Sequence, residues 1–334
     1  MIRGLVVGKF APLHRGHEFL ISTARSKCDE LLILSYTSHE FPGCDAVHRR
    51  QWIQKSFPDA RVVVLDEKES IPDDESSNEV QRAFIACKLR ELDFLPTHVF
   101  TSEDYGPGFA DHLSKTFFQS ITHVSVDPPR QKHSVSATEI RANLHENRDW
   151  MPPHVYADFV ERIAFIGAES TGKSSLGLWL SQQLETHYAS EYGRELWTQK
   201  QGKLTFEDLL FIGQRQVERE MHLAETAKRF LVCDTTPLST LFYCLNYFGK
   251  ADPRLVTLAC RRYDHLLLLP PDFPLVQDGT RQDEVFRLQQ HHWHVRELAE
   301  RNQRYVEVSG SIPERHTQLL EKFPKAQKLS GRCQ

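Results

Sequence analysis

A complete phosphate-binding signature in the second half of the chain constrains the fold most strongly. Residues 167–174 read GAESTGKS and match the pattern G-x-x-x-x-G-K-[ST] at every fixed position. An apolar run at residues 163–166 precedes the signature, and leucines at helical spacing follow it. A glycine-rich turn between a buried strand and a helix is the context in which this pattern binds nucleotide phosphates. The sequence therefore predicts a P-loop within an α/β domain.

The predicted P-loop gives its residues distinct roles. Its glycines let backbone N–H groups surround the phosphate oxygens. Lys173 would bridge the β- and γ-phosphates of ATP, and Ser174 would ligate Mg²⁺. An apolar run that ends at Asp234 supplies a carboxylate that could hold the metal or accept the proton of a substrate hydroxyl. The predicted nucleotide-binding residues are Gly167, Glu169, Ser170, Thr171, Gly172, Lys173, Ser174 and Ser175.

A proline-containing junction separates two similar patterns of secondary structure. Short apolar runs rich in β-branched residues alternate with helix-length segments, as expected for parallel strands linked by helices. Candidate strands are residues 4–7, 31–36, 61–65, 98–101 and 123–126, then 162–166, 230–233, 265–269 and 305–308. The tandem prolines at 152–153 cannot continue a helix or a central strand. We expect two doubly wound α/β domains over residues 1–150 and 151–334, since 334 residues suit two cores.

A second candidate phosphate site follows the first predicted strand. Residues 8–17 read GKFAPLHRGH and open a helix that turns apolar at Phe19. Helix starts attract anions because their N–H groups lack partners and the helix dipole adds positive charge. His14 and His17 lie three residues apart, so both could donate to one phosphate chain. Taken alone, an H-x-x-H pair is more often surface chemistry or a weak metal site, so the residues around it decide the interpretation.

Those surrounding residues resemble the signature G-x-F-x-P-x-H-x-G-H of the nucleotidyltransferase superfamily at every fixed position. Residues 135–141, VSATEIR, resemble its second phosphate motif, I-S-x-T-x-x-R. Ser136 with Glu139 also fits a simple capping box, and both explanations can hold together. The resemblance implies a Rossmann-like nucleotidyltransferase domain. Its expected ATP contacts are Gly8, Lys9, Phe10, Ser136 and Thr138, and its expected catalytic residues are His14, His17 and Arg141.

Further segments in both halves are similar to the NadR-type family of bifunctional nicotinamide mononucleotide adenylyltransferases and ribosylnicotinamide kinases. These segments are HRRQW at 48–52, TSEDYG at 101–106, VDPPR at 126–130, EYGRE at 191–195 and QDGTR at 277–281. The resemblance implies substrate contacts at Arg49, Trp52, Asp104, Glu191, Tyr192 and Arg194. Tyr192 would stack on the pyridinium ring, and Arg281 would close over the transferring phosphate. The kinase base stays open among Glu169, Glu191 and Asp234.

The resemblance implies a two-step salvage of NAD. ATP would phosphorylate nicotinamide riboside to the mononucleotide (NMN), and a second ATP would adenylylate NMN to NAD and pyrophosphate. One alternative is a riboside kinase whose N-terminal half mainly binds NAD as a regulatory module. Another is a nucleotide-sensing interaction protein with slow turnover at both sites. The expected cofactors are ATP and Mg²⁺, and the expected partners are the small molecules nicotinamide riboside, NMN, ATP and NAD.

Charge and composition argue against other classes of partner. The formal net charge of −4 offers no basic surplus for DNA, and the chain begins on the first catalytic strand, where some relatives carry a helix-turn-helix. We expect no nucleic-acid partner. The apolar runs fall far short of the roughly 20 residues that cross a bilayer, so we expect no membrane partner. The seven cysteines lack C-x-x-C spacing and no leader is evident, which favours a cytoplasmic enzyme of open oligomeric state.

Overall fold

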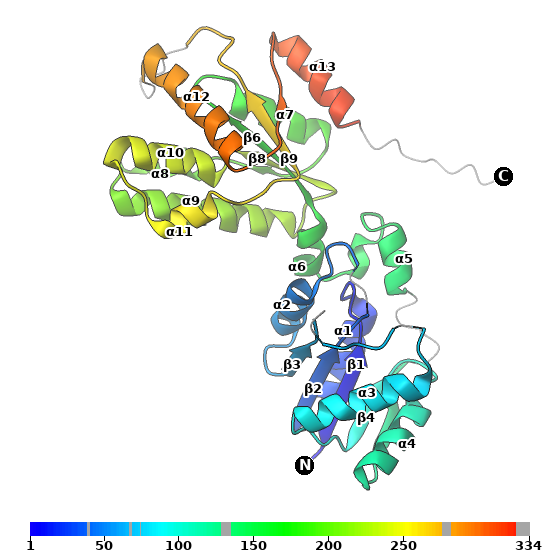
Figure 1. Ribbon diagram of the computed structural model, residues 1–334. Coiled ribbons are helices and arrows are strands. Elements are labelled where there is room, and N and C mark those ends of the chain that lie inside the picture. Colours follow the sequence, from blue (N-terminus) through cyan, green and yellow to red (C-terminus); the bar gives the residue numbers. More distant parts are fainter. Residues whose placement is uncertain (39–40, 67–68, 74, 128–134, 276–281, 325–334) are drawn as a thin grey trace, which may run out of the picture. The chain divides into compact units, whose positions relative to one another are not determined.

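The chain folds into two compact units, Met1–Phe159 and Val160–Gln334 (Figure 1). The computed structural model describes residues 1–38, 41–66, 69–73, 75–127, 135–275 and 282–324. Each unit contains a five-stranded sheet in which all described strand pairs are parallel. The predicted class of two doubly wound α/β domains is confirmed. Of the helices in these ranges, none combines the length and apolarity that crossing a membrane requires.

The first unit has the strand order β3-β2-β1-β4-β5. Its strands are β1 (Arg3–Gly8), β2 (Glu30–Ser35), β3 (Arg61–Val64), β4 (His98–Thr101) and β5 (Thr122–Ser125). Its α-helices are α1 (Arg15–Arg25), α2 (Ala46–Ser56), α3 (Asn78–Glu91), α4 (Gly106–Phe117), α5 (Ala137–Ala142) and α6 (Pro153–Tyr156). All five strands overlap the runs predicted from the sequence, with ends that differ by one residue at most.

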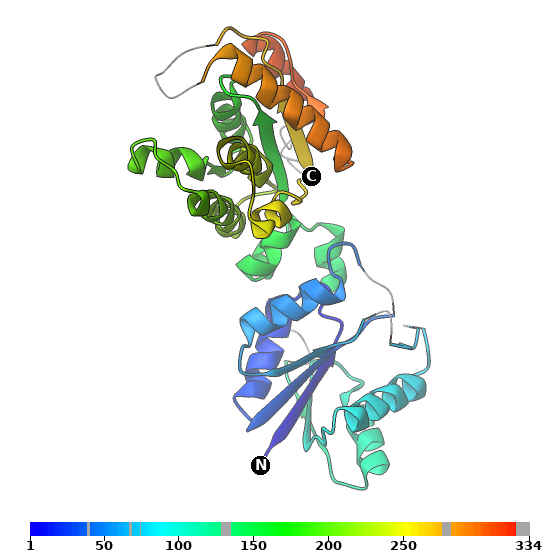
Figure 2. The same ribbon diagram turned by 60° about the vertical axis from the view of Figure 1, so that its left-hand side comes forward.

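Two helix pairs cover the two faces of this sheet (Figure 2). On one face, Leu5, Leu32 and Val99 of the strands pack against Leu89 of α3 and Leu113 of α4. The other face is covered by α1 and α2. Strand order reverses between β1 and β4, and in open α/β sheets ligands bind beyond the carboxyl ends of the strands at such a reversal. The turn after β1 therefore lies where a ligand is expected to bind.

The second unit has the order β10-β9-β6-β8-β7. Its strands are β6 (Glu161–Gly167), β7 (Tyr188–Ala189), β8 (Phe230–Asp234), β9 (His265–Leu269) and β10 (Val306–Glu307). Its helices are α7 (Lys173–Gln183), α8 (Tyr192–Gln199), α9 (Phe206–Ala224), α10 (Pro237–Phe248), α11 (Pro253–Leu258), α12 (Glu284–Glu300) and α13 (Ile312–Lys322). Leu176 of α7 and Leu319 of α13 belong to one core with the buried strand β6. Phe165 of β6 pairs with Asp234 of β8, which brings the carboxylate beside the start of the P-loop.

Candidate active sites

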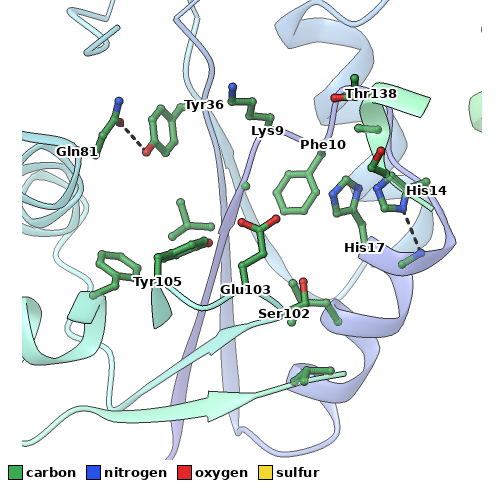
Figure 3. A pocket seen from close by; sticks show the side chains of 18 of the residues that line it. Lys9, Phe10, His14, His17, Tyr36, Gln81, Ser102, Glu103, Tyr105 and Thr138 are labelled. Atoms are coloured by element: carbon green, nitrogen blue, oxygen red, sulfur yellow. Dashed lines mark hydrogen bonds between the residues drawn. The ribbon is translucent and has the colours of Figure 1, made fainter. Parts of the chain in front are cut away.

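A pocket of about 480 Å³ lies at the carboxyl ends of the strands in the first unit (Figure 3). Gly8 at the end of β1, Ser102 after β4 and Val126 after β5 all line it. Residues of both sequence signatures meet there, although more than a hundred positions separate them in the chain. They are Gly8, Lys9, Phe10, His14, Gly16, His17, Val135, Ser136, Ala137, Thr138 and Arg141.

The turn after β1 is shaped by the packing of Phe10. This residue has a left-handed backbone, with φ 52°, and its ring is 1% exposed. A Cβ atom on Gly8 would come within 3.0 Å of that ring, so the position favours glycine. His17 lies edge-on to the same ring, with the centroids 4.9 Å apart. The buried phenylalanine thus fixes both the phosphate-binding turn and one of the two histidines.

His14 and His17 form a stacked pair at the start of α1. Their ring centroids are 3.6 Å apart, and His14 is only 6% exposed. The Nδ1 atom of His14 accepts a hydrogen bond from the Gly16 N–H at 3.1 Å, and His14 is the N-cap of the helix. In a neutral ring that acceptor role leaves the proton on Nε2. Helix geometry therefore prepares His14 to donate a hydrogen bond to an anion.

The second signature combines a helix cap with a cation. Ser136 accepts from the Glu139 N–H at 3.1 Å, and Glu139 accepts from the Ser136 N–H at 2.7 Å, so the capping box is present. Arg141 donates to Thr138 Oγ1 at 3.1 Å and to the backbone carbonyl of Ala11. Burial lowers the pKa of Arg141 from its ordinary value. The link to Ala11 joins the two signature segments directly.

Three residues assigned to the first substrate lie elsewhere. Arg49 is 1% exposed and donates to Ser35 Oγ at 2.7 Å and to the Cys44 carbonyl, which makes it part of the core. Trp52 is also 1% exposed, and its indole donates to Asp158 Oδ2 at 2.6 Å. Asp104 is exposed, and the pocket is lined by its neighbours instead. The substrate roles given to these three residues stay predictions without support from the pocket geometry.

Aromatic and amide side chains that were not predicted form the other end of the pocket. Tyr36, after β2, donates to Gln81 Oε1 of α3 at 2.9 Å. Tyr105, next to the predicted Asp104, also lines this end, whereas Glu103 lies between it and Phe10 (Figure 3). No short motif links these residues, because β2, α3 and the β4–α4 loop converge only through the sheet topology. The pocket thus has a histidine end suited to phosphates and an aromatic end suited to a flat ring.

The P-loop of the second unit has the backbone that its sequence predicts. Gly167, Ser170 and Gly172 have positive φ values of 153°, 58° and 88°. A Cβ on Gly167 would approach the Leu269 carbonyl oxygen to 2.5 Å. Thr171 donates through its hydroxyl to the Ala168 carbonyl at 2.9 Å. The loop ends at α7, whose first turn begins with Lys173, Ser174 and Ser175.

Arg315 holds the backbone of the P-loop through a hydrogen bond, a role that the sequence did not reveal. Its side chain is 0% exposed and donates to the Thr171 carbonyl at 2.7 Å. It also donates to the Gly310 carbonyl at 3.0 Å and pairs with Asp272. The P-loop is therefore held to the start of α13, nearly 150 residues away in the chain.

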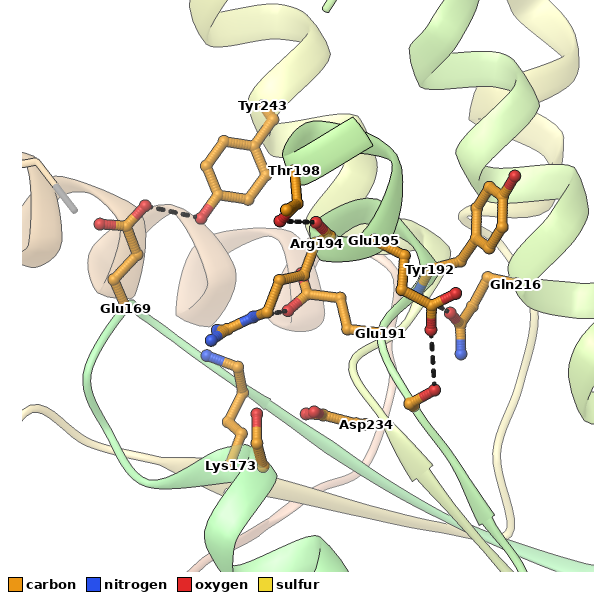
Figure 4. Close-up of polar contacts among 12 residues, drawn as sticks. Glu169, Lys173, Glu191, Tyr192, Arg194, Glu195, Thr198, Gln216, Asp234 and Tyr243 are labelled. Carbon is orange, nitrogen blue, oxygen red and sulfur yellow. Dashed lines mark hydrogen bonds and ion pairs between the residues drawn. The ribbon is translucent and has the colours of Figure 1, made fainter. Parts of the chain in front are cut away.

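Lys173 lies among carboxylates of the second unit (Figure 4). Its amine donates to the carbonyls of Gly167 at 3.0 Å and Ala168 at 2.7 Å. Burial lowers the pKa of Lys173, and the negative charges of Glu191 and Asp234 oppose that shift. Burial, followed by the charge of Asp234, raises the pKa of Glu191. The structure therefore brings together the predicted phosphate-binding lysine and two of the three candidate bases.

The third candidate base, Glu169, has partners outside this group. It accepts from the Tyr243 hydroxyl at 2.9 Å and from the Gln282 N–H at 3.1 Å. Glu191 instead pairs with Arg194, with Nε 3.6 Å from Oε2. Glu169 is thus held at the edge of the P-loop by other partners, although its negative charge also acts on Lys173.

Tyr192 and Arg281 are two further residues predicted for the kinase site. The Tyr192 ring lies 5.2 Å from the guanidinium of Arg219 and edge-on to Phe211, and in Figure 4 it points away from Lys173. Its role as a stacking platform for the pyridinium ring gains no support from this geometry. Arg281 lies outside the described residues.

The donor set at Asp234 and Ser174 suits Mg²⁺. Asp234 is 2% exposed, its Oδ2 accepts from the Tyr188 hydroxyl at 2.6 Å, and its Oδ1 is buried without a hydrogen bond to any described residue. Within the described ranges, no group of three or more His, Cys, Asp or Glu is arranged to hold a metal. Mg²⁺ commonly binds through one or two protein oxygens together with phosphates and water, so one carboxylate and one hydroxyl are sufficient.

Comparison with known proteins agrees with this two-site arrangement. The trifunctional NAD biosynthesis/regulator protein NadR of Escherichia coli strain K12 is 30% identical over an alignment of 334 positions, which covers 91% of this chain and 78% of that protein. The chain belongs to the NadR family. The predicted resemblance is thereby confirmed. A family model described as an AAA domain also matches residues 162–315, which contain the P-loop.

Solved NadR structures share the fold across nearly the whole chain. A crystal structure of NadR protein in complex with NR matches with a TM-score of 0.71 at 21% identity, covering 96% of this chain and 95% of that one. A second, in complex with NAD and AMP-PNP, matches with a TM-score of 0.68 at 20% identity, covering 96% of each chain. At these identities the likeness establishes the shared fold.

Proposed function

We propose that the chain is a bifunctional NAD salvage enzyme that phosphorylates nicotinamide riboside and then adenylylates the resulting NMN. The observation that carries this proposal is the meeting of two distant signature segments in one pocket of the first unit, in a NadR-family chain that also has a P-loop. The name of the relative, an NAD biosynthesis/regulator protein, suggests the pathway, and the solved complexes with NR, NAD and AMP-PNP suggest the ligands. We further propose that it acts in the cytoplasm on small molecules, without nucleic-acid or membrane partners.

In the first unit, the reaction is adenylyl transfer without a protein nucleophile. A phosphate oxygen of NMN attacks the α-phosphorus of ATP, and the bond from that phosphorus to the bridging oxygen breaks, releasing pyrophosphate. The negative charge that develops on the leaving oxygens is stabilised by donors already in position. His14, His17, Lys9 and Arg141 would supply this stabilisation. The aromatic end around Tyr36 would take one of the flat rings.

In the second unit, the reaction is phosphoryl transfer to a hydroxyl. The 5′-hydroxyl oxygen of the riboside attacks the γ-phosphorus of ATP, the bond from γ-phosphorus to the β,γ-bridging oxygen breaks, and ADP leaves. Glu191, whose charge acts on Lys173 and whose pKa burial raises, would accept the hydroxyl proton. Lys173 holds the β- and γ-phosphates. Bound Mg²⁺, held by Ser174 and Asp234, would neutralise phosphate charge there.

Separate product assays test the two activities. The full-length chain with ATP, Mg²⁺ and nicotinamide riboside should release ADP, and with ATP, Mg²⁺ and NMN it should release pyrophosphate and form NAD. ADP release without pyrophosphate release would leave a kinase whose first unit mainly binds NAD. Very slow release of both products, together with tight NAD binding, would instead favour a nucleotide sensor.

A further inference from the structure

Two buried threonine hydroxyls directly follow Asp234 at the end of β8. Thr235 is 5% exposed and Thr236 is 3% exposed. Neither Oγ1 atom has a hydrogen-bond partner among the described residues. Buried hydroxyls are nearly always hydrogen-bonded, and each exception calls for an explanation such as a bound ligand. Two consecutive exceptions beside the P-loop therefore point to a common cause.

The backbone at Thr235 is strained. Its φ of 77° lies in the left-handed region, which is unfavourable for a β-branched residue. The Thr235 N–H donates to the Phe165 carbonyl of β6 at 3.1 Å, and that contact holds the strained residue against the strand leading into the P-loop. Such strain persists only where the surrounding structure imposes it, and it concentrates at ligand-binding positions.

Thr236 occupies a helix cap but its side chain does not cap the helix. It is the N-cap of α10, whose first residue is Pro237, and it forms no side-chain cap hydrogen bond. A threonine at this position ordinarily accepts from an N–H in the first turn. The hydroxyl is therefore left without a partner among the described residues, as is that of Thr235, and both oxygen atoms are buried.

The charge around these hydroxyls restricts what they can bind. Phe165 pairs with Asp234, so the two threonines come beside the start of the P-loop, where the phosphates of ATP are expected. Glu191 and Asp234 lie close enough to act on the charge of Lys173. Arg194 also acts on Lys173, but it is paired with Glu191 at 3.6 Å. Beyond the positions that ATP and its metal would use, the remaining carboxylate charge disfavours a second anion. A neutral or cationic polyol fits better than a phosphorylated acceptor.

We infer that Thr235 and Thr236 bind the hydroxyl groups of the nucleoside at the kinase site and orient its phosphate-accepting end. This inference rests on the kinase activity proposed above and adds the residues that recognise the acceptor. Each threonine hydroxyl can donate one hydrogen bond and accept others, which matches a sugar hydroxyl. Binding the nucleoside would then satisfy both buried oxygen atoms.

Isosteric substitutions in the full-length chain test the inference. Thr235→Val and Thr236→Val remove the hydroxyls but keep the β-branched shape, whereas Thr235→Ser and Thr236→Ser keep the hydroxyls. Thr257→Val on α11 is a matched control, because that exposed hydroxyl donates to the Pro253 carbonyl of its own helix. ADP release is measured while nicotinamide riboside and ATP are varied in turn, and pyrophosphate release from NMN reports on the first unit.

Each valine variant should lower kcat/KM for the riboside about tenfold, the loss expected for one hydrogen bond, and leave the KM for ATP within about twofold. The serine variants should retain most activity, and Thr257→Val should match the wild type. The inference is overturned if the valine variants match the wild type, if the serine variants fail equally, or if the KM for ATP rises as much as that for the riboside. A wild-type chain that phosphorylates no riboside would overturn the proposed kinase function itself, and this inference with it.

Discussion

The hydroxyl of Tyr188 offers a sharp test of the kinase site, because it controls how Asp234 presents its two oxygens. It donates to Oδ2 of Asp234 at 2.6 Å, while Oδ1 forms no hydrogen bond within the described part of the chain. Burial and the charge of Asp234 raise the pKa of Tyr188, so the hydroxyl stays protonated and keeps donating. The Tyr188 ring packs closely against Gly177, since a Cβ atom on that glycine would come within 3.0 Å of the ring. Tyr188→Phe keeps the ring and removes the hydroxyl.

The size of the effect follows mainly from the bond to Asp234, because the other contact of the hydroxyl, to the Ser174 carbonyl, is long at 3.4 Å. A hydrogen bond to a charged group contributes about 1.5–3 kcal/mol, and about 1.4 kcal/mol corresponds to a tenfold change in rate. If Asp234 must be held in place during phosphoryl transfer, kcat for ADP release should fall about 10- to 100-fold in Tyr188→Phe. The KM for riboside should change little, because the tyrosine orients the carboxylate and need not touch the nucleoside.

The assay compares Tyr188→Phe with Tyr305→Phe in the full-length chain. Tyr305 is 37% exposed, so its substitution controls for loss of a tyrosine hydroxyl in the same unit. Steady-state ADP release gives kcat and KM, and pyrophosphate release from NMN confirms that the first unit works. A kcat within twofold of the wild type would refute the positioning role of Tyr188.

Four further predictions address other parts of the two sites. His17→Ala should remove several kcal/mol of transition-state stabilisation from adenylyl transfer, which lowers the rate of pyrophosphate release roughly a hundredfold or more and leaves ADP release unchanged. Lys173→Ala should do the reverse. Loss of both activities in either folded variant would contradict two independent sites. Trp52→Phe should lower the free energy of unfolding in urea by about 1–3 kcal/mol without raising the KM for NMN, whereas a raised KM would support the substrate role predicted from the sequence. Arg315→Met should destabilise the second unit by about 3 kcal/mol and raise the KM for ATP, and an unchanged KM would show that the P-loop needs no such support. Chelation of Mg²⁺ with EDTA should stop ADP release, with recovery on adding Mg²⁺; undiminished release would remove the metal role of Asp234.

Local patterns predicted the scaffold and the phosphate-binding segments well. Of the ten strands in the described residues, nine overlap predicted runs, because buried parallel strands appear in the sequence as short apolar segments. The exception is β7, whose two residues, Tyr188 and Ala189, are too few to show a pattern. The P-loop and the turn at residues 8–17 were visible because their backbone function requires particular residues at fixed spacing.

Side-chain roles that depend on tertiary packing were harder to predict. With the same local sequence, an arginine or a tryptophan can either contact a ligand or pack in the core. Arg49 and Trp52 are buried and hydrogen-bonded to other protein groups. Tyr192 likewise faces α9 and Arg219. The support from Arg315 could not be predicted either, since it depends on where α13 docks on the second sheet. Contacts of this kind join residues that are far apart in the chain, so they depend on the tertiary fold.

The central claim is that one chain carries out two consecutive reactions, and a single time course tests it most directly. The purified full-length chain is incubated with ATP, Mg²⁺ and nicotinamide riboside, and NMN and NAD are followed by chromatography. NMN should appear first and NAD should follow, with ADP and pyrophosphate as the respective co-products. Formation of neither nucleotide would contradict the account, and NMN that never proceeds to NAD would contradict its claim for the first unit.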